Sequence, residues 1–241
     1  LERVRFTRVN DSNTYLNCSE AASREHSEHL TFWVPGYQFM PKYKSKVWDG
    51  KIRLYSEWSP YIQTGLVPRA IQFFKKNGYS VELDQGVAAS FLDSSISEGD
   101  LLEWIESQAI YDNSGDEIVP FDHQFEAVLA MLKHKRLTLL SPTSSGKSLI
   151  IYLTTKWRLE ADRKGVLIVV PTQQLVEQMA NDISCYSAGT MDTHKVYSGK
   201  DKFSDTRVII STWQSIYKLG NEFFDRFGTV ILDEGHLAVG K

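Results

Sequence analysis

Cysteine is scarce in this sequence, which has 241 residues and only two cysteines, Cys18 and Cys185. They lie far apart and form no C-x-x-C pair, so the sequence offers neither a disulfide framework nor a cysteine-based zinc site. No uninterrupted apolar stretch approaches the roughly 20 residues of a membrane helix, and no secretory signal peptide opens the chain. These absences predict a cytoplasmic protein with no membrane partner.

The sequence also lacks an excess of basic residues. Lysine and arginine total 27 against 30 acidic residues, which leaves a formal net charge of -3. The chain as a whole therefore has no bulk attraction to nucleic acid, and any polyanion must be bound by a local basic patch. Apolar residues make up 42% of the sequence, which is enough for the core of one large domain or two ordinary ones.

Metal-ligand spacing is absent among most of the histidines. We expect ordinary surface or hydrogen-bonded roles for His26, His29, His123, His134 and His194, because none stands at ligand spacing from carboxylates or cysteines.

The character of the chain changes near residues 111–118, where the segment YDNSGDEI gathers turn-forming residues. We expect a boundary there, with a small α+β domain over residues 1–112 and an α/β domain over residues 113–241. Ser19 is the expected N-cap of the first helix. The upstream pattern predicts a strand over 3–9, a helix over 19–33, a strand over 51–56, and a helix, glycine stop and strand over 66–83.

Downstream of this boundary, short apolar runs alternate with amphipathic stretches. Strands are predicted over 136–141, 166–171, 194–198, 207–212 and 229–234. Helices are predicted over 146–161, 172–187 and 213–220. Apolar strands separated by helices are typical of a parallel sheet that is covered on both faces. The downstream half therefore has the layout of an α/β nucleotide-binding fold.

A glycine-lysine-serine segment, SPTSSGKS at residues 141–148, follows the first of these strands and opens the first helix. The backbone N–H groups expected to surround the phosphates of ATP are those of Ser144, Ser145 and Gly146. Lys147 would meet the phosphate charge, and Ser148 would ligate Mg²⁺. The usual first glycine is replaced by Ser141, and the alternative is a chance sequence at a helix start. The strand before it and the helix after it favour a phosphate-binding loop.

An acidic pair ends the last predicted strand, in the segment VILDEGH. Asp233 would hold Mg²⁺, and Glu234 would orient the attacking water, which is the arrangement that phosphoryl transfer to water requires. A lone Asp-Glu pair after a strand is usually part of a solvated loop. Because ligands of α/β sheets bind at the carboxyl ends of the strands, we expect these carboxylates and Lys147 to converge on one magnesium-triphosphate pocket.

Taken together, SPTSSGKS and DEGH resemble the superfamily 2 helicases, specifically the DExH type. The resemblance implies a RecA-like parallel-sheet domain, the first of two helicase lobes. In PFDHQFEAV it implies that Gln124 reads adenine, since an amide can pair with both N6 and N7 of that base. It also implies that His236 links the γ-phosphate region to the second lobe.

Two further segments follow the order of motifs in the same family. VVPTQQLVEQM and ISTWQSI resemble the segments that contact the sugar-phosphate backbone of the tracking strand. This resemblance implies nucleic-acid contacts at Pro171, Thr172, Gln178, Thr212 and Trp213.

The front domain contains a local basic patch with interleaved aromatic residues, PKYKSKVWDGKIRLY at residues 41–55. We expect nucleic-acid contacts from Lys42, Lys44, Lys46, Trp48, Lys51 and Arg53. Cations pair with phosphates, and aromatic rings stack on exposed bases. The alternative is a strand-turn-strand with a solvated face, in which Trp48 packs inward and Asp-Gly forms a tight turn.

Over nearly the whole chain, the sequence is similar to the UvsW-type recombination and repair helicases of T-even-like bacteriophages. VWDGKIRLYS and GLVPRAIQFFKKNGY carry this resemblance in the front domain. It implies ATP-driven remodelling of branched or forked DNA and RNA–DNA hybrids, in the host cytoplasm, with recombination or replication proteins as partners.

A Ser-Ala-Thr-like motif and a second lobe, both present in complete helicases, are missing from the sequence. The chain therefore corresponds to the ATP-binding half, and we expect it to hydrolyse ATP poorly on its own. Three alternatives stay open: a P-loop kinase, a non-catalytic DNA-binding module with structural nucleotide, and another motor such as a restriction-enzyme translocase subunit or an XPB-related repair helicase.

Overall fold

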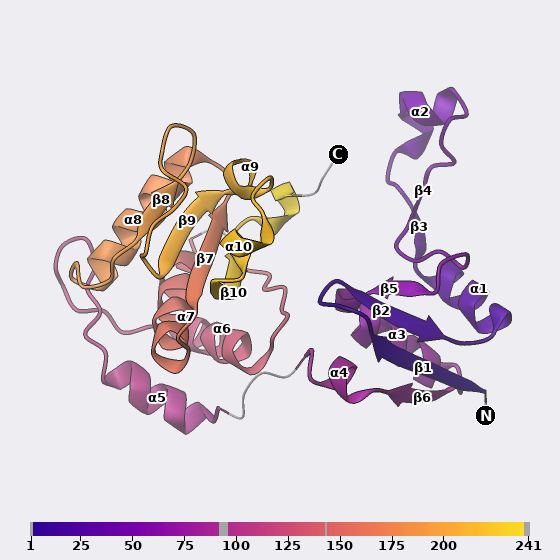
Figure 1. The fold of residues 1–241 in the computed structure, drawn as a ribbon, viewed down its shortest axis with the longest axis horizontal. Coiled ribbons are helices and arrows are strands. Elements are labelled where there is room, and N and C mark those ends of the chain that lie inside the picture. The colour runs from indigo at the N-terminus through magenta and orange to yellow at the C-terminus, as the bar shows by residue number, and fades with distance from the viewer. Residues whose placement is uncertain (1, 92–95, 143, 239–241) are drawn as a thin grey trace. The chain divides into compact units, whose positions relative to one another are not determined.

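The structure is a computed structural model that describes residues 2–91, 96–142 and 144–238. It forms two compact units, Leu1–Asp93 and Ser94–Lys241, which are coloured indigo to purple and magenta to yellow in Figure 1. This division corrects the predicted boundary at residue 112. The segment before that residue belongs to the second unit because Leu101, Ile105 and Ile110 are buried in its core.

The first unit contains a mixed four-stranded sheet in the order β5-β2-β1-β6. Its strands are β1 (Arg3–Arg8), β2 (Asn13–Asn17), β5 (Tyr61–Gln63) and β6 (Ser80–Leu83), and its other elements are α1 (Glu20–His29), η2 (Thr64–Leu66), α3 (Val67–Lys76) and α4 (Gln85–Ala88). Strand β1 pairs antiparallel with β2 and parallel with β6. The α+β character predicted for this half is confirmed.

Alternation along β1 buries one face of this sheet. Val4 and Phe6 are buried, and they share a core with Phe74 of α3. Ser19 caps α1 as predicted, because its side chain accepts a hydrogen bond from the Ala22 N–H. The predicted helix over 19–33 is too long, since α1 ends at His29 and the next residues form a strand.

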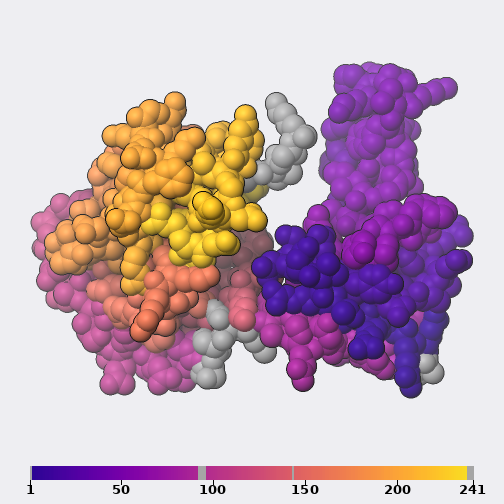
Figure 2. All heavy atoms as spheres, viewed as in Figure 1, coloured from indigo at the N-terminus to yellow at the C-terminus, as the bar shows by residue number. Residues whose placement is uncertain are grey.

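Residues 31–53 form a separate extension of the first unit. It comprises strand β3 (Thr31–Trp33), the turn η1 (Tyr37–Phe39), helix α2 (Pro41–Lys44) and strand β4 (Lys51–Arg53). Strands β3 and β4 pair antiparallel, and α2 lies at their far end in Figure 1. In Figure 2 the extension, in purple, stands clear of the rest of its unit.

The second unit contains an all-parallel sheet in the order β10-β7-β9-β8. The strands are β7 (Gly165–Val170), β8 (His194–Val196), β9 (Val208–Thr212) and β10 (Phe227–Leu232). The helices are α5 (Glu98–Glu106), α6 (Asp122–Lys133), α7 (Lys147–Ala161), α8 (Gln173–Tyr186), α9 (Trp213–Ile216), α10 (Asn221–Phe224) and η3 (Gly235–Ala238). The predicted parallel α/β sheet is confirmed.

Both faces of this sheet are covered, which explains why its strands lack polar alternation. Every residue of β7 is buried. Ile168 faces a core built with α6, α7 and α8, whereas Leu167 faces a second core that contains residues of α9 and α10. Among the described residues, no helix has the length and hydropathy of a membrane span.

The predicted strand over 136–141 is wrong, because these residues form no strand in the structure. Leu137, Leu139 and Leu140 are exposed, Leu140 to 93%. A strand is stabilised by a hydrogen-bonded ladder, and this segment joins none. Within the described part of the chain, the outer edge of β10 is likewise unpaired, and Val230 and Leu232 there are about half exposed.

Candidate nucleotide and nucleic-acid sites

The described residues 141–142 and 144–146 form a tight loop directly before α7, which begins at Lys147. Gly146 adopts φ +73°, and Ser144 also lies in the left-handed region at φ +65°. The Ser145 hydroxyl donates to the Pro142 carbonyl at 2.9 Å and contacts the Ser141 hydroxyl, so the residue that replaces the usual glycine helps to close the loop. Thr143, expected only to shape this loop, lies outside the described residues.

The loop is held from the side by helix α6. The Gln124 amide nitrogen donates to the Ser145 carbonyl at 3.1 Å, and His123 Nε2 lies 3.0 Å from the same oxygen. Gln124 Oε1 accepts the Phe121 N–H at 2.9 Å, and the Gln124 side chain is buried. An amide has two donors and two acceptor lone pairs, so each end of Gln124 keeps one position for a base edge.

Gly146 provides a test of this arrangement. We expect Gly146→Ala to weaken ATP binding at least about tenfold, because an added Cβ would overlap Gln124 Nε2 and displace the loop. The left-handed backbone adds a cost of about 1–2 kcal/mol for any L side chain. The measurement is titration with a fluorescent ATP analogue, accompanied by thermal unfolding.

Gly189→Ala is the matched control for that test. Gly189 has φ +75°, but a Cβ there would meet nothing within 4 Å. It should therefore lose stability without losing nucleotide affinity. Equal affinities for ATP in wild type and Gly146→Ala would show that the contact between Gln124 and the loop does not matter for binding.

The acidic segment after β10 faces the loop lysine. The Lys147 ammonium lies 3.0 Å from Glu234 Oε1, and His236 Nδ1 lies 3.3 Å from Glu234 Oε2. The Asp233 N–H donates to the Val169 carbonyl at 2.9 Å, which continues the β10–β7 ladder and fixes where the acidic pair leaves the sheet. Residues 87 positions apart in the sequence are thus brought into contact.

The pKa values of the two carboxyl groups are shifted in opposite directions. Burial raises the pKa of Asp233 above its ordinary value, although the Lys147 ammonium opposes that shift. The pKa of Glu234 is lowered, because its carboxylate accepts a hydrogen bond from the Lys147 ammonium. Glu234 also has φ +49°, an uncommon backbone angle for a side-chain-bearing residue, of the kind that gathers at functional sites.

Mg²⁺ fits the chemistry of the donors near this pair. The half-buried Ser148 hydroxyl lies in the first turn of α7, and Asp233 supplies a carboxylate at the edge of the sheet. Mg²⁺ prefers oxygen ligands and usually takes one or two carboxylates together with water and phosphate oxygens. No group of three metal-ligating side chains occurs in the described ranges, so such an ion would depend on the nucleotide.

The two predicted backbone-contact segments meet on the carboxyl side of the sheet. Pro171, Thr172 and Thr212 line one hollow of about 560 Å³. Thr172 caps α8, and Thr212 hydrogen-bonds to the Ser215 hydroxyl at 2.9 Å. Gln178 and Trp213 do not line the hollow, although Gln178 is exposed and Trp213 is partly exposed.

Sequence reasoning missed the loop that completes this hollow. The loop follows β8 and contributes Tyr197, Ser198, Gly199, Lys200 and Lys202. The Lys200 ammonium lies over the Tyr197 ring at 5.6 Å, while Tyr197 itself donates to Glu177. Two lysines beside a glycine, directly after a predicted strand, were the available signal for it.

The predicted basic patch lies on the extension, but its members differ in availability. Lys42, Lys44 and Lys46 are exposed. Lys51 sits over the Trp33 ring at 4.6 Å, and Arg53 is paired with Asp49 at 2.5 Å. Trp48 is half-buried and its indole N–H donates to the Lys51 carbonyl, so the inward-packing alternative holds for part of this ring.

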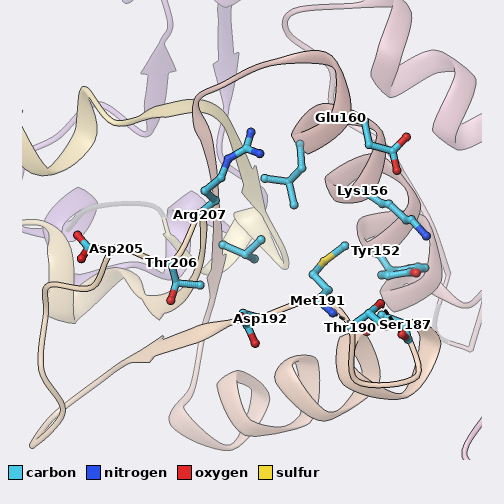
Figure 3. A pocket seen from close by; sticks show the side chains of 12 residues that line it. Tyr152, Lys156, Glu160, Ser187, Thr190, Met191, Asp192, Asp205, Thr206 and Arg207 are labelled. Atoms are coloured by element: carbon cyan, nitrogen blue, oxygen red, sulfur yellow. Dashed lines mark hydrogen bonds between the residues drawn. The ribbon is translucent and has the colours of Figure 1, made fainter.

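A further hollow of about 620 Å³ lies near the amino end of β9, as Figure 3 shows. Its lining mixes the cations Lys156 and Arg207 with the acids Glu160, Asp192 and Asp205. Arg207 also donates to the Asp162 and Lys164 carbonyls, which ties this wall to the start of β7. The hollow is therefore separate from the Lys147 site, which lies at the other ends of the strands.

A phosphate-type loop beside a parallel α/β sheet, faced by an Asp-Glu-x-His segment at the carboxyl ends of its strands, defines the first lobe of a DExH protein of superfamily 2. The chain belongs to the family described as the type III restriction enzyme res subunit, which matches residues 117–241. Residues 3–84 match the family of the N-terminal domain of DNA helicase UvsW.

Similar proteins agree with this assignment. The chain is 34% identical over 235 residues to the ATP-dependent DNA helicase UvsW of Enterobacteria phage T4, covering 95% of this chain and 46% of that protein. It is 33% identical over 121 residues to the DNA 3′-5′ translocase XPB2 of Sulfurisphaera tokodaii, covering 50% and 26%. A crystal structure of the phage T4 UvsW helicase matches with a TM-score of 0.82 and 31% identity, covering 98% of this chain and 84% of that one.

The chain thus spans half or less of the length of the curated relatives it matches. Activity, substrates and partners of the whole protein are therefore matters of proposal.

Proposed function

We propose that this chain is the ATP-binding half of a DNA-dependent ATPase motor, a helicase of the DExH type. The observation that carries the proposal is the contact between the Lys147 ammonium and the Glu234 carboxylate, which joins two separate motifs in one site. A phosphate-binding lysine beside a carboxylate that can orient and deprotonate water is suited to ATP hydrolysis.

Each residue of the site has a proposed task. Backbone N–H groups of Ser144, Ser145 and Gly146 bind the phosphates, and Lys147 neutralises their charge. Ser148 and Asp233 would hold Mg²⁺, which supplies charge neutralisation and orientation of the triphosphate. Glu234, whose pKa is lowered, is ionised at neutral pH and accepts a proton from water. Gln124 positions adenine, and His236 transmits the state of Glu234 to the second lobe.

DNA is the proposed track. The hollow between α8, the loop after β8 and the end of β9 presents hydroxyl groups and the lysines Lys200 and Lys202, which suit a sugar-phosphate backbone. The extension adds three exposed lysines to the first unit. We infer branched or forked DNA and RNA–DNA hybrids as substrates, because the likeness to the UvsW helicase includes the first unit. Recombination or replication proteins would be its partners, in the cytoplasm of the host cell.

A translocase subunit of a restriction enzyme is the second candidate function. Its support is the family match of residues 117–241, which does not include the first unit. A protein that moves on duplex DNA without separating its strands would favour this candidate. A non-catalytic module with structural nucleotide would show no DNA-stimulated hydrolysis at all.

Phosphate release by the complete protein tests the proposal. We expect duplex, forked and single-stranded DNA to stimulate release, and Lys147→Ala to abolish it, because that variant removes the cation from the triphosphate. Lys156→Ala, on the same helix α7, is the control and should keep wild-type turnover. DNA-independent release in the complete protein would reject a motor. Residues 1–241 alone should turn over slowly, since they span less than half of the length of the UvsW helicase they match.

A further inference from the structure

We propose that the end of the extension contains a pocket for one unstacked nucleotide of single-stranded DNA. The pocket is a hollow of about 750 Å³, within the range of about 300–1,000 Å³ that small-molecule sites occupy. Its lining combines two aromatic rings, two lysines, an amide and an aliphatic side chain: Tyr43, Trp48, Lys44, Lys46, Gln38 and Val47. This inference rests on the proposed function, because it assumes that the protein binds nucleic acid.

The charge of the lining suits a phosphate. Lys44 and Lys46 are exposed, and no ion pair holds either ammonium within the described part of the chain. The single carboxylate of the lining, Asp49, is paired with Arg53 at 2.5 Å. The pocket therefore presents two available cations and no unpaired acid, which favours a polyanion over a protein segment of mixed charge.

The two rings are fixed before any ligand arrives. Tyr43 meets the edge of Tyr37 at 4.8 Å between ring centroids, and the Trp48 indole N–H donates to the Lys51 carbonyl at 2.9 Å. Preset rings lose little conformational freedom on binding, and bases stack on such rings with little dependence on sequence. Gln38 is exposed beside them, and its amide has the donors and acceptors that a base edge needs.

The backbone around Lys46 gives independent support. Lys46 adopts φ +59°, a left-handed angle at which glycine and asparagine are more usual. The turn is held by the Lys46 N–H, which donates to the Tyr43 carbonyl at 2.9 Å, and by the Val47 N–H, which donates to the Lys42 carbonyl at 3.1 Å. A long cation placed at a disfavoured angle, on the wall of a pocket, indicates a use for its charge.

Lys46→Asn separates binding from folding in the test. Asparagine tolerates the left-handed angle at least as well as lysine, so the turn should persist while the ammonium is lost. We expect affinity for a short oligothymidylate, followed by fluorescence anisotropy without ATP, to fall about fivefold or more. The log–log slope of affinity against salt should become shallower by about 0.7. Val47→Glu, at a position that is 79% exposed, should weaken binding similarly.

Matched controls carry the same charge changes elsewhere in the first unit. Lys75→Asn and Val9→Glu alter exposed positions outside the pocket and should leave affinity unchanged. An abasic oligonucleotide of equal length should bind wild type several-fold more weakly than oligothymidylate, and Val47→Glu should shrink that difference. The proposal would be overturned if the control variants lost as much affinity as the pocket variants, or if wild type bound abasic and base-bearing strands equally well. ATP hydrolysis plays no part in these measurements, so a failed ATPase test would leave their result intact.

Discussion

Replacing Glu234 by glutamine should lower DNA-stimulated ATP hydrolysis by the complete protein about 10²- to 10⁴-fold while ATP still binds. Glutamine keeps the size of the side chain but cannot accept a proton from water. The substitution also removes the carboxylate that pairs with Lys147 at 3.0 Å. Because that pair is partly exposed, its loss has a small effect, so ATP affinity should stay equal or rise by less than about tenfold.

Steady-state phosphate release and equilibrium binding of a fluorescent ATP analogue measure the two effects separately. Glu222→Gln, an exposed position in the same unit, is the control and should match wild type in both. If Glu234→Gln hydrolysed ATP as fast as wild type, another group would have to be the proton acceptor. A loss of ATP binding equal to the loss of turnover would instead indicate that Glu234 only holds the loop in place.

The parallel sheet could be predicted from the sequence because its signal is local. Strand β7 has no polar side chain and β9 is apolar over its first three residues, and every residue of both strands proved to be buried. The position of Glu234 at the carboxyl edge followed from the rule that parallel strands end on the same side, whereas Lys147 reaches that edge from the start of α7 although the described residues just before it form no strand. Gly78, with φ +81°, likewise marked the end of α3.

The missed features depend on contacts between distant residues. Segment 136–141 has the composition of a strand, but composition cannot show whether a neighbouring edge will pair with it. The turn-rich segment 111–118 suggested a boundary between domains. In the structure it is part of the second unit, because the Cys185 thiol of α8 contacts the Tyr111 carbonyl and Tyr111 forms a β-bridge with Glu117. The short helix α2 interrupts a stretch that reads as strand and turn, and Pro41 at its first position was the local signal.

His26 shows the same limit, because its sequence context suggested a surface or hydrogen-bonded role. In the structure it is fully buried, and neither ring nitrogen has a hydrogen-bond partner among the residues that the structure describes. Its ring lies among Tyr55, Phe73 and Phe74, with centroids 4.9–5.4 Å away. Burial lowers the pKa of His26 to about 4, and the nearby His29 contributes to that shift. The imidazole is therefore neutral in the folded unit at neutral pH.

The first unit should consequently lose stability in mild acid. In the unfolded chain His26 titrates near its ordinary pKa of 6.5, whereas in the folded unit it resists protonation until about pH 4. Stability is therefore fully present above pH 6.5 and falls as the pH drops from 6.5 towards 4, by up to about 3 kcal/mol. The reason is that only the unfolded state takes up the proton in that range.

His26→Leu should remove this dependence, because leucine has a similar volume and no titrating group. At pH 7.5 we expect the variant to be at least as stable as wild type, since an unsatisfied buried ring is replaced by an apolar side chain. At pH 4.5 it should exceed wild type by about 2 kcal/mol or more. Hydrogen exchange of α1 and α3 amides, corrected for intrinsic rates, gives the opening free energy of the unit at each pH. The exposed His29→Gln variant should keep most of the wild-type pH dependence, because burial is the larger cause of the His26 shift. Parallel pH curves for wild type and His26→Leu would show that another group controls acid stability.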